Sequence, residues 1–449
     1  MNLKHAAAAL ALTSLVAAGA AQAAPKEITV AIASTFTTLD PYDASDTLSQ
    51  TASKSFYEGL FTFDKDMKVI DALATDYKVS DDGLVYTVTL RKGVKFHDGS
   101  EFQADAVKAN FDRVTNKANG LKRYMLYQNI EKTEVVDPYT VRFTLKKPFS
   151  SFINQLAHPA GVMICPSTLA NKTNKQIAFE PCGTGPYTLD KYNPSEGMRV
   201  VKNPNYWQAG FPKLDAINWK PVVENSTRVA MLLTGEAQFA FPLPAEQVKQ
   251  VQGKDQVRLD ITPSIILRYV EMNMSKKPFQ DKRVREAFNY AINKEALCKV
   301  AFAGYADPAT GYAPAAIDFA EKLGPWPYDP KKARELLKEA GYGSGLTINL
   351  WSGYNHTTAQ KVIQSLQQQL AQVGVKSNIR ALEAGQRTAL VESVPTPDKS
   401  QHDLYYIGWS SSTGELDYAI RPLLASENMP PVGSNEAYYK SEKVDRLIQ

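Results

Sequence analysis

The serine-rich segment at residues 408–412 comes nearest to a motif for nucleophilic chemistry. Serine hydrolases of the α/β type carry G-x-S-x-G, in which the second glycine lets the backbone turn sharply and expose the serine. Here the segment reads GWSSS, so Ser412 stands where that glycine is needed. Neither H-E-x-x-H, C-x-x-C nor G-x-x-x-x-G-K-[ST] occurs in the chain. The sequence therefore argues against an enzyme.

The sequence also shows no cluster of residues that could bind a metal ion. Beyond residue 23 the histidines are isolated from one another in the sequence, at His97, His158, His356 and His402. Protein metal sites gather such ligands at short spacings, so we expect no metal and no other cofactor. The GTGP run at residues 183–186 precedes the strand-like YTL, which favours a tight turn over a phosphate-binding loop.

Three cysteines allow at most one disulfide and leave one free thiol. Cys298 falls in the helical stretch 294–302 and is expected to be a small buried apolar residue. Cys165 and Cys182 each stand beside a proline or in a strand-to-loop sequence, and they are the pair we would join. A bridge and two separate buried thiols both remain open, because sequence does not supply the Cα separation that a disulfide needs.

The elements that must position any site alternate between strands and helices, which indicates an α/β fold. The run YTVTL at residues 86–90 alternates faces, and it follows the turn-forming DDG at 81–83. Strands are predicted at residues 27–33, 84–91, 140–146, 197–202, 267–273, 347–351 and 402–408.

Helices are marked by their caps and apolar stripes. Asp281 is expected to cap a helix with Val284, Ala287, Phe288, Ala291 and Ile292 on its buried face. Asp329 followed by proline predicts a second helix that ends before Gly341. Thr357 opens a third, which runs to Gln372 and ends at Gly374.

Length and charge limit the remaining classes of protein. A chain of 449 residues usually forms more than one domain. Its net charge of +4 is small, and no cluster of Lys and Arg marks a nucleic-acid surface. We therefore expect no nucleic-acid partner.

The first 23 residues have the pattern of a secretory signal peptide. Lys4 precedes a short apolar run, and Ala21-Gln22-Ala23 forms an A-x-A cleavage site. No cysteine lies near this site, and no later segment is apolar for long enough to cross a bilayer. We expect residues 1–23 to be removed and a soluble, periplasmic protein to begin at Ala24.

Several motifs then occur in the order typical of one known family. The stretch VSDDGLVYTVTLRKGVKFHDGSEF at residues 79–102 closely resembles the signature of the family 5 solute-binding proteins. Further matches are TTLDPYDA at 37–44, CGTGPY at 182–187, NPNYW at 203–207, RVAMLLTGEAQFAF at 228–241, FQDKRVREAFNYAIN at 279–293 and YDPKKARELLKEAGY at 328–342. The resemblance runs from about residue 26 to the end of the chain.

The resemblance implies a two-lobed periplasmic-binding-protein fold of type II, of the large cluster with an extra subdomain in lobe one. Lobe I is expected at residues 24–57 and 185–262, the extra subdomain at 58–184, and lobe II at 263–449. Family members return into lobe I at their C-terminus, and that return is expected to be absent from this sequence. Ligand binding should close the lobes by hinge motion.

Within the family, other segments resemble the glutathione-binding branch. They include DTLSQTASKSFYEGLF at residues 46–61, LKRYMLYQNIEKTE at 121–134, VAFAGYADPATG at 300–311, WSGYNHTTAQKV at 351–362 and GWSSSTGELDYA at 408–419. The likeness implies a monomeric ABC-importer component that captures glutathione and delivers it to permease subunits in the inner membrane. A dipeptide or oligopeptide binder of the same family is the alternative, and a binder of metal chelates is disfavoured.

The resemblance also suggests which side chains contact the ligand. In peptide-binding relatives an aspartate after the Gly-Trp pair holds the ligand amine, and here Ser412 takes that position. The ammonium partner then moves, by hypothesis, to Asp417, and Trp409 becomes a pocket wall. The other expected contacts are Arg123 with Tyr124, Arg268 in its cleft strand, and Thr38, Asn355 and His356 in loops that follow strands.

Overall fold

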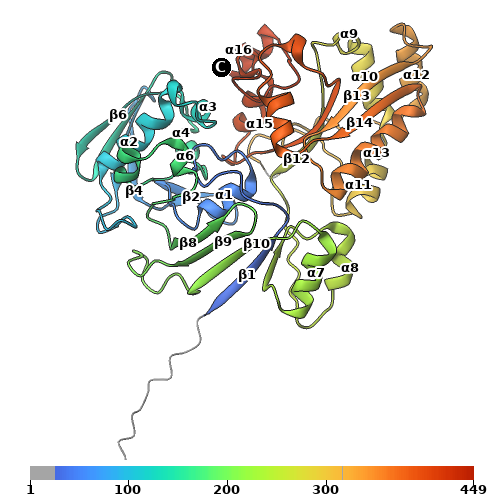
Figure 1. Ribbon diagram of the computed structural model, residues 1–449. Helices are drawn as coiled ribbons and strands as arrows, with labels where there is room; N and C mark the ends of the chain where they lie inside the picture. Colours follow the sequence, from blue (N-terminus) through green and yellow to red (C-terminus); the bar gives the residue numbers. More distant parts are fainter. Residues whose placement is uncertain (1–25, 316) are drawn as a thin grey trace, which may run out of the picture.

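The computed structural model describes residues 26–315 and 317–449, so the predicted signal peptide lies outside the described residues. Figure 1 shows two bodies side by side, with the first half of the chain in one and the orange and red segments in the other. Residues 252–265 connect them without regular helix or strand. Within the described part of the chain, no helix is long and apolar enough to cross a membrane.

Lobe I is built on a five-stranded sheet of order β11-β1-β10-β9-β8. Strand β1 pairs in parallel with both β10 and β11, whereas β8, β9 and β10 pair antiparallel. The elements of lobe I are β1 (Glu27–Ile32), α1 (Thr47–Ser53), β8 (Tyr187–Asn193), β9 (Gly197–Lys202), β10 (Ala216–Pro221), α7 (Asn225–Thr234), β11 (Phe239–Phe241) and α8 (Val248–Val251).

The subdomain between β1 and β8 carries a second sheet, of order β4-β5-β7-β6. Its elements are β2 (Phe61–Phe63), β3 (Val69–Asp71), β4 (Ala74–Val79), β5 (Val85–Leu90), α2 (Ala104–Thr115), α3 (Tyr124–Tyr127), β6 (Ile130–Asp137), β7 (Thr140–Leu145), α4 (Phe152–Leu156), α5 (Pro166–Asn171) and α6 (Asn174–Ile177). One continuous buried cluster joins this subdomain to lobe I, from Val30 and Ile32 through Phe56 to Phe111 and Phe143. The two sheets are separate, but their apolar core is shared.

Lobe II has a four-stranded sheet of order β12-β15-β13-β14. Strand β13 pairs in parallel with β14 and β15, and β12 is the antiparallel edge. Its elements are β12 (Ile266–Met272), α9 (Lys277–Gln280), α10 (Lys282–Ala291), α11 (Lys294–Phe302), α12 (Pro330–Glu339), β13 (Leu346–Ser352), α13 (Thr357–Ala371), β14 (Val375–Ala381), α14 (Ala384–Arg387), β15 (Leu404–Ser410), α15 (Asp417–Leu424) and α16 (Glu442–Ile448).

The caps and stripes read from the sequence are present in lobe II. The Asp281 side chain accepts from the Arg283 N–H at the start of α10, and Asp329 does the same for Lys332 in α12. Helix α13 has His356 as its N-cap and is followed by Gly374 at φ 86°. Each of the seven predicted strands is present with ends shifted by at most two residues.

Two details of the sequence interpretation need correction. Ile292 was expected on the buried face of α10, but the helix ends at Ala291 and Ile292 has extended backbone as its C-cap. Cys298 lies within α11 as predicted, yet it is only partly buried, because α11 packs against the helix α13 and buries little of its own surface.

Cys165 and Cys182 are joined by a disulfide in the structure, with their Cα atoms 5.4 Å apart. The Cys165 N–H also donates to the Cys182 carbonyl. The GTGP run that follows is a packed turn: a Cβ on Gly183 would lie 2.3 Å from the Phe56 carbonyl oxygen. Glycine is needed here for close backbone approach, as the turn interpretation requires.

Candidate functional site

The carboxyl ends of the parallel strands of lobe II open toward lobe I. In open α/β sheets, ligands bind outside these ends, where the following loops diverge. Strand β13 leads into the loop at residues 353–356, β14 leads into α14, and β15 leads into residues 411–416. The amino end of the antiparallel β12 lies at the same edge, because Ile266 pairs with Ser410. Most of the predicted lobe II contacts belong to these segments.

Arg268 extends across the sheet toward the loop after β13. Its guanidinium lies 4.5 Å from the centroid of the Tyr354 ring, a cation–π contact. Gly408 is its cross-strand neighbour, and a Cβ there would come within 2.7 Å of the Arg268 side chain. The Arg268 side chain is exposed, and no residue of the described ranges accepts a hydrogen bond from it. Its donors are therefore available to a ligand.

The loop at residues 353–356 is fixed by local contacts. The Asn355 side chain donates to Glu383 at 2.6 Å, which ties this loop to the segment after β14. His356 Nδ1 accepts from the Ala359 N–H as the cap of α13, and its ring lies 5.5 Å from Tyr354. Neighbouring atoms desolvate the His356 ring and lower its pKa, and the positive charge of Arg268 lowers it further. Part of the side chain is open to solvent. These surroundings favour the neutral form of His356.

The segment after β15 is occupied by internal contacts. Trp409 Nε1–H donates to the Tyr418 carbonyl at 2.7 Å, and the two rings are 5.4 Å apart. The Ser412 hydroxyl donates to the Ser410 carbonyl at 3.2 Å. Asp417 accepts from Arg421 one turn later in α15, at 2.9 Å. A ligand ammonium at Asp417 would have to share that carboxylate with Arg421.

This segment also contacts the lobe I body. Arg123 is buried and donates to the Tyr418 hydroxyl at 3.1 Å, while two other donors of its guanidinium bind the Ala44 carbonyl. Asn154 donates to the Thr413 carbonyl at 2.8 Å, and the His158 and Tyr418 rings are 5.6 Å apart. Arg123 thus links the two lobes and has fewer unused donors than Arg268.

The remaining predicted residues, Thr38 and Tyr124, lie on the lobe I side. Buried Thr38 accepts from the Asp40 N–H at 3.0 Å, and Asp40 in turn forms a buried ion pair with Arg113. Tyr124 begins α3 and is partly buried. Both predictions as ligand contacts stay untested.

Tyr354 and Arg387 were missed by sequence reasoning, although both lie at this edge of the sheet. Tyr354 sits within the WSGYNH segment that carried part of the resemblance, so its place after a strand could have indicated it. Arg387 is the last residue of α14, in the sequence EAGQR, and nothing in its local pattern separates it from a surface arginine.

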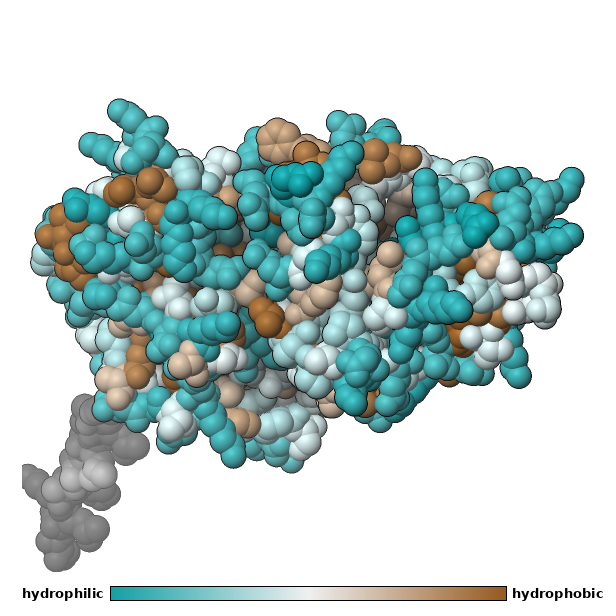
Figure 2. Space-filling view, turned by 90° about the horizontal axis from the view of Figure 1, so that it is seen from above, coloured by the Kyte–Doolittle hydropathy of each residue, from teal (hydrophilic) through white to brown (hydrophobic). Residues whose placement is uncertain are grey.

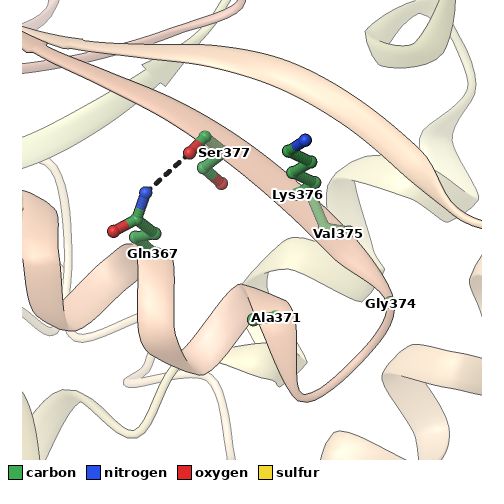
Figure 3. Close-up of a pocket in the computed structure, with 6 residues that line it drawn as sticks. All are labelled: Gln367, Ala371, Gly374, Val375, Lys376 and Ser377. Atoms are coloured by element: carbon green, nitrogen blue, oxygen red, sulfur yellow. Dashed lines mark hydrogen bonds between the residues drawn. The ribbon is translucent and has the colours of Figure 1, made fainter.

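A surface cavity of about 320 Å³ lies elsewhere in lobe II, between α13 and the beginning of β14 (Figure 3). Its lining residues are Gln367, Ala371, Gly374, Val375, Lys376 and Ser377. Gln367 donates to the Ser377 carbonyl at 2.7 Å across it. This is the amino end of β14, opposite the carboxyl ends described above, so the cavity does not belong to the candidate site.

Comparison with known proteins agrees with the two-lobed architecture. The chain superposes on a Helicobacter pylori periplasmic binding protein, DppA, in complex with the peptide STSA, at a TM-score of 0.84 and 28% identity. That match covers 94% of this chain and 85% of the other. A dipeptide-binding protein of Pseudoalteromonas in complex with Met-Leu gives 0.85 and 26%, with 94% and 87% covered.

Sequence relatives are considerably more similar. A protein named glutathione-binding protein GsiB from Salmonella choleraesuis is 58% identical over 438 residues, covering 98% of this chain and 85% of the relative. Its counterpart from Escherichia coli O157:H7 is 57% identical over 425 residues, covering 95% and 83%. Residues 68–431 match the model for bacterial extracellular solute-binding proteins, family 5 Middle. The chain is therefore a non-enzymatic binding protein that belongs to family 5 of the bacterial extracellular solute-binding proteins.

Proposed function

We propose that this protein captures glutathione between its two lobes and delivers it to the permease of an ABC importer. The observation that carries the proposal is the identity of 57–59% to proteins named for glutathione binding, over 95–98% of this chain. Paralogues in one fold differ chiefly at the ligand, so such identity along nearly the whole chain supports a shared ligand.

The charges of glutathione explain what the site must provide. The tripeptide has two carboxylates, one ammonium and a thiol, and buried charges are costly unless they are paired. Arg268 suits a carboxylate because its planar fork donates two parallel hydrogen bonds, and Tyr354 already orients it. Asp417 retains acceptor positions beyond those used by Arg421, because a carboxylate has about four. We assign the ammonium to Asp417.

The other predicted contacts complete this assignment. Trp409 and Ser412 would line the β15 side of the site, and Asn355 and His356 the β13 side. Thr38, Arg123 and Tyr124 would face the ligand from lobe I. Arg123 contributes by holding the two lobes in register through Tyr418 as well as by its charge.

The proposed cellular setting follows from the family and the leader sequence. A periplasmic receptor must be exported, and residues 1–23 carry a signal-peptide pattern. Figure 2 shows hydrophilic side chains over most of one face, with small separate apolar patches. We infer that the protein works as a monomer and meets the permease subunits by its lobe surfaces.

A dipeptide or oligopeptide ligand is the second candidate. The structures of peptide-bound relatives at TM-scores of 0.84 and 0.85 favour it. Ser412 argues against this candidate. By the family resemblance, peptide-binding relatives have an aspartate at this position that holds the peptide amine, and serine has no carboxylate. The two candidates differ in the ligand, so binding experiments separate them.

Calorimetric titration of the purified protein with glutathione, glutathione disulfide and a dipeptide panel tests the proposal. We expect glutathione or its disulfide to bind more tightly than any dipeptide. Arg268→Ala should lose about 2–5 kcal/mol of binding free energy, because a desolvated carboxylate would be left unpaired. Arg258→Ala, which removes an exposed ion pair with Asp260, is the matched control and should bind as the wild type does. Binding of dipeptides without glutathione would overturn the proposal.

A further inference from the structure

Arg387 lies at the end of the lobe II sheet where the parallel strands finish. Arg268 lies at the same end, on a different element. It ends α14, which follows β14, and a π-helical turn begins at the next residue, Thr388–Glu392. Such π-helical turns occur frequently at functional sites. The turn packs on the sheet face that carries Trp351 and Tyr405, through Leu390 and Val391. Arg387 is thereby positioned by a packed segment and not by a free loop.

The Arg387 guanidinium is enclosed but incompletely used. Its side chain is 17% exposed, and Nε lies 2.8 Å from a Glu392 carboxylate oxygen. That contact lacks hydrogen-bond geometry, so Nε is buried without an acceptor. The Glu392 carboxylate also accepts from Thr388 at 3.0 Å. The two terminal amino groups of Arg387 find no acceptor within residues 26–315 and 317–449, which leaves the fork open for bidentate binding.

The charge of Arg387 is influenced by groups of lobe II and by one group of lobe I, Asp46. Burial acts to lower the pKa of Arg387, but Glu392, Tyr405, Tyr354 and Asp46 together raise it above its ordinary value. Tyr354 is the ring that Arg268 covers, and Asp46 is the N-cap of α1 in lobe I. Arg387 therefore remains charged at its partly enclosed position.

The two arginines belong to segments that pack on opposite faces of the lobe II sheet. Side chains alternate along a strand, so Arg268 shares a face with Val270 and Met272, which pack on the α10–α13 side. The segment after Arg387 packs on the other face. The two guanidiniums have unused donors and lie at the same end of the sheet, carried by β12 and by the segment after β14, so together they can bind two negative charges.

We propose that Arg387 binds a ligand carboxylate, so that Arg268 and Arg387 together select ligands with two carboxylates. The inference rests on the proposed function, since glutathione is such a ligand, and it adds the residue that distinguishes a dicarboxylate from a simple dipeptide. A dipeptide with apolar side chains has one carboxylate and would leave one guanidinium unpaired, which is costly in an enclosed site.

The test titrates four proteins with three ligands. The proteins are the wild type, Arg387→Met, Arg387→Lys and the control Arg380→Met. Arg380 is an exposed arginine of β14 whose guanidinium lies over the Trp351 ring of β13. The ligands are glutathione, glutathione with its glycine carboxylate amidated, and an analogue without the glutamyl α-carboxylate. Thermal unfolding without ligand verifies that each variant folds.

We expect the wild type to lose about 30-fold or more in affinity for the analogue that lacks the carboxylate bound by Arg387. Arg387→Met should bind glutathione about 30-fold more weakly and should no longer distinguish it from that analogue. Arg387→Lys should fall between the two, because a lysine keeps the charge without the fork. Arg380→Met should bind as the wild type does.

Two results would overturn the assignment. In one, Arg387→Met binds glutathione within about threefold of the wild type, well below the loss expected of a buried charge pair. In the other, the variant loses affinity but still discriminates among the three ligands as the wild type does, which marks a merely structural role. If the wild type binds no glutathione, the proposed function is wrong. The role of Arg387 is then tested by titrating the wild type and Arg387→Met with the dicarboxylate dipeptide Glu-Gly and with its amide, which has one carboxylate fewer.

Discussion

The position of Arg268 depends on the absence of a side chain at Gly408. Gly408 stands opposite on β15, and the arginine side chain crosses the space that a Cβ would fill. The Gly-Trp pair at residues 408–409 therefore has two separate functions: the glycine makes room for a cation, and the tryptophan anchors the next segment through Tyr418.

Gly408→Ala should weaken glutathione binding by about tenfold or more, because the new methyl group would displace the Arg268 side chain from Tyr354. The clash is with a flexible side chain, so the melting temperature should change little. Calorimetry and thermal unfolding measure the two effects. Gly385→Ala is the control, since a Cβ there meets no atom within 4 Å. An unchanged affinity in Gly408→Ala would show that Arg268 does not need its present position.

Sequence reasoning placed some residues at the candidate site and passed over others, for a physical reason. Arg268 was predicted because it lies in a strand whose place in the fold was recognisable. Arg387 was not singled out, because its position depends on which elements pack around a short helix and a π-helical turn, and such contacts leave no local pattern. Asp417 was predicted, but its pairing with Arg421 is a side-chain geometry that sequence alone does not give.

At the scale of elements, the end of β12 carries a buried pair of acids. Glu271 in β12 and Glu436 near the C-terminus are both more than nine-tenths buried, and Glu271 Oε2 has no hydrogen-bond partner in the described structure. The Met274 N–H donates to the Ala437 carbonyl, so the C-terminal segment lies along this strand. Burial raises the pKa of Glu436 to about 8, and burial with Glu436 nearby raises that of Glu271 well above its ordinary range.

The free energy of unfolding should therefore fall as the pH rises from about 5 to about 8. In this window the folded protein keeps a proton on Glu436 that the unfolded chain, with a pKa near 4.5, has released. The expected slope is about 1.4 kcal/mol per pH unit for each proton retained, and Glu271 adds to it because its pKa is raised as well. Urea denaturation at pH 5, 6.5 and 8 measures it.

Glu436→Gln imitates the protonated acid, so it should remove the part of this slope that comes from Glu436 and be more stable than the wild type at pH 8. The exposed Glu427, exchanged for glutamine, is the control and should leave the slope unchanged. An equal slope in the wild type and Glu436→Gln would contradict the assignment of the proton.

The disulfide links the start of α5 to the loop before β8, and it closes a loop of 17 residues. In the chain-entropy model a loop of this size stabilises the fold by about 3 kcal/mol. Thiol titration of unfolded, unreduced protein should find one free thiol, Cys298. Cys298→Ser should then show none, whereas three thiols in the wild type would refute the bridge.

The elements themselves were largely predictable from the sequence, since caps, turns and alternation are local signals. Helices α10 and α12 start directly after Asp281 and Asp329, whose side chains cap them as predicted, and α13 starts at Thr357 as predicted. The disulfide was left open because Cα separation is a tertiary quantity. The end of α10 was misplaced by one residue, because the apolar Ile292 continues the stripe after the backbone has left the helix.

At the scale of the whole molecule, a single stretch of residues, 252–265, joins two bodies that also touch through side chains. Asn154 and Arg123 reach residues 413–418 of lobe II, and Lys361 lies 3.7 Å from Glu246 of lobe I. Tyr418 also packs against the apolar core of lobe I, so these contacts are both polar and apolar. Domains joined by such contacts can move relative to each other unless the interface is large and hydrophobic. The relative placement of the lobes follows from these contacts and could not be read from the sequence.

Glutathione should shift the molecule toward a closed form. Small-angle scattering should give a smaller radius of gyration with saturating glutathione than without it, because a ligand bound by both lobes favours their approach. A dipeptide that calorimetry shows not to bind is the control. An identical radius with binding independently verified would argue against closure.

The stacking of Trp409 on Tyr418 gives the protein an intrinsic optical reporter. The indole belongs to the strand that borders the site, and its partner Tyr418 contacts Arg123 and His158 of the other body. Any change in the spacing of the lobes must alter the polarity and the quenching groups around this ring. Tryptophan emission can therefore follow lobe movement in real time without an attached dye, and Trp409→Phe identifies the part of the signal that comes from this position.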